Sequence, residues 1–231
     1  MSRIHAILTV ASAALVFPAL LDAAAWRQTI QRPNCSFCEM GVLQMETQIE
    51  FSRVYTGNYR HGEPYDFITA NPSGTGESFA DAGISIRARF SCLQPGQQDF
   101  VPVVGEPAGE IVLWSPDLCM CIPIVANAAS DANGWVEWSG APAAGGCTQG
   151  LQVWMTGIYV GEIPVNINSA DFGSAWPCFT DHSDLAAFAT RLGRVDRWDI
   201  CFDFNESGPP TIDAADLAFF ASSLGAACSW R

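Results

Sequence analysis

Alternation of apolar and polar residues is the dominant pattern over most of the chain. It is clearest in residues 84–92, where Ile84, Ile86, Ala88, Phe90 and Cys92 point one way and serines and arginines point the other. A period of two is typical of a half-buried β-strand. No helical period appears between the N-terminal apolar run and residue 183.

Further strands are expected where short apolar runs lie between turns rich in Gly, Pro and Asn. These predicted strands are residues 44–55, 111–114, 135–138, 151–160 and 165–168. Residues 26–42 are predicted as a loop or edge segment, and residues 56–81 as a long loop. Short strands joined by turns favour an antiparallel β-sandwich.

Near the C-terminus the pattern changes to that of two amphipathic helices. Apolar residues recur there at i, i+3, i+4 and i+7, and we expect the two stripes to pack on each other. A glycine follows each helix as a stop signal, Gly193 after the first and Gly225 after the second. The stripes are Leu185, Phe188, Ala189 and Leu192, and Leu217, Phe220, Ala221 and Leu224.

The two helices belong to an internal repeat. Residues 171–193 and 203–225 align without a gap at an offset of 32, with 11 of 23 positions identical. Each copy is an acidic, turn-rich loop followed by a short helix. The segments are therefore interpreted as copies of one supersecondary unit.

Oxygen-bearing side chains recur along both loops of the repeat. Alternate oxygen ligands, a glycine at the sharp turn and an acidic residue at the helix start are what a calcium loop needs. The three-residue spacing of the aspartates at each helix start also fits an N-cap with a third-residue carboxylate, which needs no metal. The candidates are Asp171, Asp181 and Asp184, and Asp203, Asn205, Ser207, Gly208, Asp213 and Asp216.

At these residues the chain resembles a dockerin module, a pair of EF-hand loops that each lack the leading helix. The resemblance covers residues 168–231. It implies calcium as a cofactor, with Asp203, Asn205, Ser207, Asp213 and Asp216 as ligands if Pro209 and Pro210 are an insertion. The first copy departs at Gly173, Ala175 and Trp176. The resemblance also implies docking to a cohesin-like protein or to the protein's own sandwich through His182, Ser183, Ala214 and Ala215.

Two further segments indicate what lies before the dockerin-like module in the chain. Residues 130–157 resemble the late strands of bacterial Ig-like domains, with an Asp-x-Asn-Gly turn before an alternating strand. Residues 1–25 combine a short basic start, an apolar run and an Ala-x-Ala site, which predicts a secretory signal; a membrane anchor is the alternative. The expected organisation is a signal peptide (1–25), an Ig-like β-sandwich (26–167) and a dockerin-like module (168–231), mainly β with a small α part.

Nine cysteines are expected to form mostly disulfides in an exported protein, with one left over. Predicted pairs join Cys92 to Cys35 or Cys38, join Cys147 to Cys119 or Cys121, and lie within the repeat among Cys178, Cys201 and Cys228. The spacing of Cys35 and Cys38 also occurs in redox and zinc motifs, but no thioredoxin-like pattern surrounds them.

Composition narrows the functional classes. The net charge is −13 and the 11 basic residues are all arginines, which disfavours binding to nucleic acids and anionic membranes. His61 is the one histidine in the expected sandwich, so a Ser-His-Asp or histidine–metal site is hard to build. We therefore predict a non-catalytic secreted protein.

Two hypotheses remain for its function. The first is calcium-dependent protein docking in an extracellular polysaccharide-degrading or adhesive assembly. The second is a carbohydrate-binding sandwich with a metal-free helix pair. The second hypothesis rests on four tryptophans of the predicted strands, whose indole rings could stack on sugar rings; the alternative is that these side chains fill the core. They are Trp114, Trp135, Trp138 and Trp154. Trp135 and Trp138 lie on opposite faces of a strand, so at least one of them should be exposed.

Overall fold

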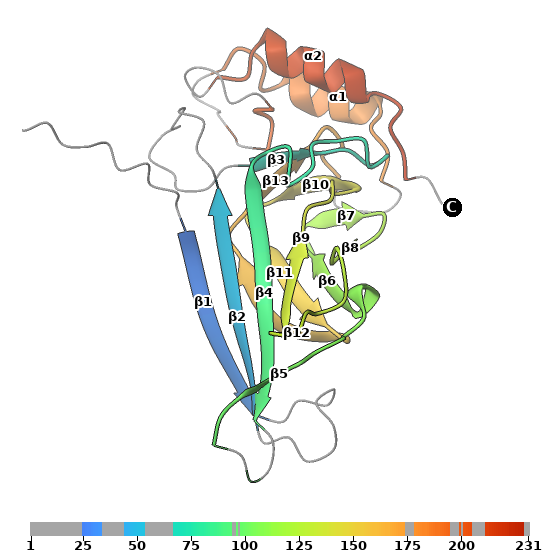
Figure 1. Ribbon diagram of the computed structural model, residues 1–231. Helices are drawn as coiled ribbons and strands as arrows, with labels where there is room; N and C mark the ends of the chain where they lie inside the picture. The colour runs from blue at the N-terminus through green and yellow to red at the C-terminus, as the bar shows by residue number, and fades with distance from the viewer. Residues whose placement is uncertain are drawn as a thin grey trace, which may run out of the picture.

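The part of the chain that the structure describes is mainly β with two short α-helices, as the sequence predicts. The structure is a computed structural model, and it describes residues 25–33, 44–53, 67–93, 96, 98–173, 178–194, 199, 201–204 and 211–228. Figure 1 shows the helices lying together across one end of the β-structure. No helix in these ranges is long and apolar enough to cross a membrane.

The longest strands form one sheet. It contains β1 (Ala25–Pro33), β2 (Gln44–Arg53), β4 (Ile84–Leu93) and β5 (Val101–Pro102), and β9 (Trp135–Trp138) also pairs with β4. All of these pairs are antiparallel. Ile86, Ala88 and Phe90 of β4 are buried, which confirms the predicted alternation.

Two four-stranded sheets complete the β-structure. The first sheet has the strand order β3 (Phe67–Ala70), β13 (Asn166–Ser169), β10 (Ala144–Thr148) and β7 (Leu118–Met120). The second sheet has the strand order β12 (Ile158–Ile163), β11 (Leu151–Met155), β6 (Ile111–Trp114) and β8 (Ile124–Val125). A short 3₁₀ helix, η1 (Ala108–Glu110), precedes β6. Only the β3–β13 pair is parallel among the described strands. In Figure 1, β4 lies in front of β11.

One hydrophobic core joins the three sheets, and this three-sheet β-structure is called the sandwich below. Phe90 from the long sheet, Ile167 from β13 and Val153 from β11 have no exposed surface and belong to the same cluster of buried residues. Burial of this apolar surface is the main favourable term that holds the sheets together.

Two expectations for the strands need correction, and a third is confirmed in part. Residues 151–160 are not one strand but the hairpin β11–β12, which turns at Thr156 and Gly157 with positive φ angles of 51° and 76°. The predicted loop 56–81 contains the strand β3. The segment from residue 26, predicted as a loop or edge segment, begins in the edge strand β1, which confirms the edge alternative. In residues 151–160 the turn falls at Thr156 and Gly157, which interrupt the alternating apolar positions of the two strands.

The helices α1 (His182–Ala189) and α2 (Ala214–Ser223) pack on each other as predicted, but they bury only part of the predicted stripes. Phe188 and Phe220 are buried and stack with ring centroids 5.4 Å apart. Leu185, Leu192 and Leu224 are 38%, 38% and 47% exposed, and the last two lie beyond the helix ends. The core of the pair is instead made of six phenylalanines from helices and loops: Phe172, Phe188, Phe202, Phe204, Phe219 and Phe220.

Three disulfides join the sandwich to the helix pair, which corrects the predicted pairing. They are Cys119–Cys178, Cys121–Cys228 and Cys147–Cys201. Cys147 does not pair across the β7–β10 ladder because Gly145 lies opposite Cys119. The three repeat cysteines do not pair with one another because each meets a sandwich cysteine.

One further predicted pair joins Cys92 to Cys35 or Cys38. Cys92 is disulfide-bonded, and Cys35 and Cys38 lie outside the described residues. All seven described cysteines are therefore in disulfides. This extent of oxidation is typical of proteins from oxidising compartments.

Candidate functional site

The acidic residues of the first repeat copy accept backbone hydrogen bonds. Asp184 lies on the buried face of α1, where its Oδ2 accepts the Asp181 N–H at 2.8 Å and its Oδ1 accepts the Phe172 N–H at 2.9 Å. Asp181 in turn accepts the Ser183 N–H at 2.7 Å, which completes a capping box. Hydrogen bonds from the Ser183 hydroxyl and amide lower the pKa of Asp181.

The second copy has the same arrangement. Asp216 has no exposed surface; its Oδ2 accepts the Asp213 N–H at 2.8 Å and its Oδ1 accepts the Phe204 N–H at 2.6 Å. Asp213 accepts the Ala215 N–H at 2.7 Å. Each of these four residues corresponds to a first-copy residue at the offset of 32, so both helices start in the same way.

The copies also bind each other reciprocally. The Gly193 N–H donates to the Ile212 carbonyl at 2.7 Å, and the Gly225 N–H donates to the Thr180 carbonyl at 2.9 Å. Gly193 corresponds to Gly225 and Thr180 to Ile212, so the pair has approximate two-fold symmetry. Both glycines have positive φ angles, 71° and 82°, which confirms them as helix stop residues.

Asp171 lies where the helix pair meets the sandwich. It is 4% exposed, its carboxylate accepts the Gly173 and Phe179 amides at 3.0 Å, and its carbonyl accepts the Gly146 N–H of β10. Burial raises its pKa from the usual 3.8 to about 6, and the charge of Asp184 raises it too. The corresponding Asp203 is also buried, and its carbonyl accepts the Asn168 side-chain amide at 2.8 Å.

A calcium ion needs several oxygen ligands that converge on one point. In the described residues no three carboxylates converge closely enough to share an ion; the one converging group of potential ligands is Cys121, Cys178 and Cys228, whose sulfurs are in disulfides. Asp181 and Asp184 form the capping box of α1, and calcium binding by the first loop stays a prediction. Asn205, Ser207 and Gly208 lie outside the described residues.

The four residues predicted to face a docking partner share one location. They are exposed and lie in the first turns of the two helices: His182, Ser183, Ala214 and Ala215.

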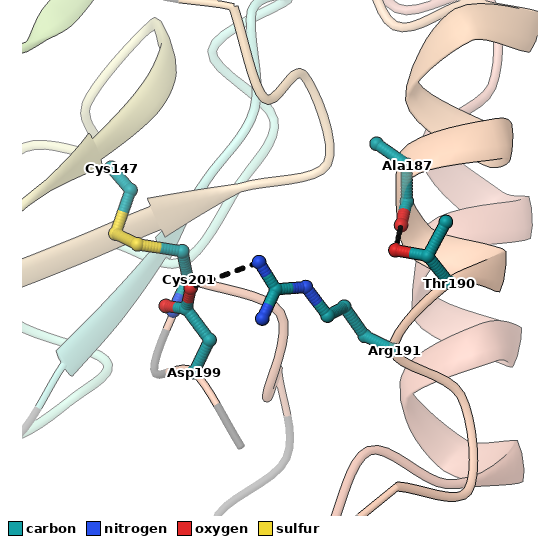
Figure 2. A network of polar contacts seen from close by, with 6 residues as sticks. All are labelled: Cys147, Ala187, Thr190, Arg191, Asp199 and Cys201. Atoms are coloured by element: carbon teal, nitrogen blue, oxygen red, sulfur yellow. Dashed lines mark hydrogen bonds and ion pairs between the residues drawn. A yellow bond between two sulfur atoms is a disulfide. The ribbon is translucent and has the colours of Figure 1, made fainter. Parts of the chain in front are cut away.

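A salt bridge lies next to one of the disulfides that join the helix pair to the sandwich. Figure 2 shows Arg191, just beyond α1, reaching toward Asp199 beside the Cys147–Cys201 bridge. The Arg191 guanidinium lies 4.0 Å from the Asp199 carboxylate and 5.1 Å from the centroid of the Phe202 ring. These contacts hold the end of α1 against the segment that carries Cys201.

A second candidate site lies on the sandwich, where three aromatic side chains occupy neighbouring strands. Trp114 of β6 and Trp154 of β11 have ring centroids 6.2 Å apart and planes at 82°, and Tyr159 of β12 lies 5.7 Å from Trp154. All three are partly exposed, whereas the alternating residues Leu113 and Val153 are fully buried. We call Trp114, Trp154 and Tyr159 the aromatic face.

The other two tryptophans weighed for sugar binding lie on β9. Trp138 is 1% exposed and belongs to the core, whereas Trp135 is partly exposed and lies under the Arg87 guanidinium, 4.5 Å from its ring centroid. The expectation that at least one of them is exposed is confirmed. Trp135 already has a cationic partner on its face, so Trp114 and Trp154 are the stronger candidates.

The sequence identified Trp114 and Trp154 singly but not as a pair. Their register, with Gln152 opposite Trp114 and Trp154 opposite Val112, brings them together across β6 and β11. Residues 111–114 are all apolar, so their pattern does not distinguish the inner from the outer face. The chain matches no protein-family model, no curated protein and no solved structure.

Proposed function

We propose that this protein is a non-catalytic, secreted carbohydrate-binding module. An Ig-like β-sandwich carries the glycan site, and a dockerin-like repeat serves as a structural helix pair. The observation that carries the proposal is the aromatic face on the outer side of the β12-β11-β6-β8 sheet.

The aromatic face leaves apolar surface in water, which folding alone does not favour. The apolar surface continues to the edge strand, because Val125 of β8 pairs with Val112 and is 51% exposed. Contiguous apolar surface of this kind marks ligand sites. The negative face of an indole ring attracts the C–H groups on the flat side of a pyranose, while the sugar hydroxyls stay in water.

The surroundings of the aromatic face favour binding over catalysis. The described residues that line the adjoining hollow include one carboxylate, Glu110. Hydrolysis of a glycosidic bond ordinarily uses two carboxylates on opposite sides of the bond. A protein with this site is therefore expected to hold a glycan without cleaving it.

Affinity electrophoresis of the full chain through gels containing soluble neutral polysaccharides tests the proposal. We expect retardation in at least one gel, with Trp154→Ala weakening binding about tenfold, or 1.4 kcal/mol. Trp135→Ala is the matched control, since it removes a partly exposed indole from another sheet and should bind as the wild type. An unretarded wild-type band in every polysaccharide gel would overturn the proposal.

The structural role of the helix pair is supported by its attachment. Three disulfides fix it to the sandwich, so of the two expected docking partners we favour the protein's own sandwich over a separate cohesin-like protein. A panel of cohesins immobilised on beads should not retain the full chain. Retention by one cohesin, lost when His182 and Ala214 are changed to bulky charged residues, would show docking to a separate partner instead.

A second candidate function, calcium binding by the second loop, is favoured by the burial of Asp203 and Asp216 at 1% and 0% exposure. Asp203, Asn205, Ser207, Asp213 and Asp216 would hold the ion, which would crosslink the loop to the start of α2. Calorimetric titration of the EDTA-treated full chain with calcium tests it. Heat of binding that disappears in Asp203→Ala supports this function, and the absence of heat in the wild type excludes it.

A further inference from the structure

The aromatic face adjoins a hollow of about 360 Å³, which lies within the usual range for small-ligand sites. Apolar groups dominate its lining, which includes Pro123 and Val112, the residue opposite Trp154 in the β6–β11 register. The lining residues are Gly109, Glu110, Val112, Trp114, Pro123, Trp154 and Gly157.

Charge restricts what this hollow can bind. Glu110 is the one ionisable side chain among its lining residues, and the whole chain carries a net charge of −13. A glycan with carboxylate or sulfate groups would be repelled both locally and over a longer range. The ligand should therefore carry no anionic group and should offer a hydrogen-bond donor to Glu110.

The polar atoms of the indoles restrict the ligand further. The Trp154 Nε1–H already donates to the Gln152 side-chain oxygen at 3.0 Å. A sugar hydroxyl placed between the two indoles would lose water without gaining that donor, which is costly. An apolar substituent fits this place better.

The angle between the Trp114 and Trp154 rings sets the shape of the space beside them. At 82° they form a corner, so a pyranose that lies flat on one ring turns one edge toward the other ring. From these constraints we propose that the hollow selects an N-acetylated hexosamine unit of a neutral glycan. The acetamido methyl lies in the corner between Trp114 and Trp154, and the amide N–H donates to Glu110. This inference rests on the proposed glycan-binding function.

Calorimetric titration of the full chain with oligosaccharides of equal length tests the selectivity. The probes are a chitin tetramer, a cellulose tetramer, a fully deacetylated chitin tetramer and a uronic acid tetramer. We expect the chitin tetramer to bind about tenfold more tightly than the cellulose tetramer, a difference usual for one apolar group in a pocket. The uronic acid tetramer should not bind.

Gly109→Leu provides a blocking variant. A Cβ added at Gly109 has no other atom within 4 Å, so the new side chain can enter the hollow without displacing its neighbours. Gly140→Leu is the control, since Gly140 has equally open surroundings outside the hollow. We expect Gly109→Leu to abolish binding of the chitin tetramer and Gly140→Leu to leave it unchanged, with thermal midpoints confirming that both variants fold.

The outcomes separate this inference from the function on which it rests. Equal or tighter binding of the cellulose or deacetylated tetramer, weakened by Gly109→Leu, would overturn the acetamido selectivity and leave glycan binding intact. Binding that Gly109→Leu does not affect would place the site elsewhere and also overturn the inference. If no tetramer and no polysaccharide binds, both fail.

Discussion

Replacing Asp216 distinguishes a helix cap from a metal ligand. Its two carboxylate oxygens accept the amides of Asp213 and Phe204 at 2.8 and 2.6 Å, and its side chain has no contact with water. Asp216→Ala removes both acceptors. Asp216→Asn keeps the shape but turns an NH₂ group toward one of the two N–H donors.

The loss of stability in Asp216→Ala depends on whether water can replace the lost hydrogen-bond acceptor at each backbone amide. The Phe204 amide is buried and stays unsatisfied, at about 1–3 kcal/mol, whereas the Asp213 amide lies at a partly exposed position and recovers much of its loss in water. Loss of the charge at the helix start adds about 0.3–1 kcal/mol. We expect Asp216→Ala to cost about 2–4 kcal/mol and Asp216→Asn somewhat less. For a protein of this size that lowers the thermal midpoint by about 5–15 °C.

Thermal unfolding of the full chain, followed by circular dichroism, should be measured in EDTA and in calcium. A cap predicts the same loss in both conditions, because the amides need an acceptor whether or not an ion is present. Asp184→Ala in the first copy is the matched control and should give a similar but smaller loss, because Phe172 is only partly buried. A loss confined to calcium, with wild-type stability in EDTA, would refute the capping interpretation of Asp216.

Two further predictions concern the junction between the helix pair and the sandwich. Because folding raises the pKa of Asp171 to about 6, the native state binds more protons than the unfolded state between about pH 4 and 6. The free energy of unfolding should therefore fall by at most about 3 kcal/mol as pH rises through this window. Urea titrations at several pH values should show that Asp171→Asn removes this pH dependence. An unchanged pH dependence in the variant would assign the effect to another titratable group. Changing Cys147 and Cys201 together to serine opens a bridge of sequence separation 54 and should cost about 4 kcal/mol without weakening glycan binding. A variant as stable as the wild type by urea denaturation would show that this bridge adds nothing.

Local patterns predicted local structure well. The alternation of residues 84–92 predicted β4 and its buried face, and the three-residue spacing of aspartates predicted both capping boxes. In each case the interacting groups lie within a few residues of one another. The helix bounds were less well predicted, because Leu192 and Leu224 continue the helical period past the helix ends.

Contacts between distant segments were not predictable in the same way. The spacing of Cys178, Cys201 and Cys228 suggested pairing within the repeat, yet each pairs with a sandwich cysteine at a sequence separation of 54 to 107. The pairing of Trp114 with Trp154 depends on the β6–β11 register, which no local pattern encodes. The same holds for the phenylalanine core, because half of its six rings come from loops around the helices.

The most direct test of glycan binding at the aromatic face is oxidative footprinting of the full chain, read by mass spectrometry with and without the best-retarding polysaccharide. Bound glycan should protect Trp114, Trp154 and Tyr159 from oxidation and leave Trp135 as reactive as in the free protein. Protection of Trp135 alone, or equal oxidation of all four residues with and without the glycan, would contradict the assignment of the site to this face.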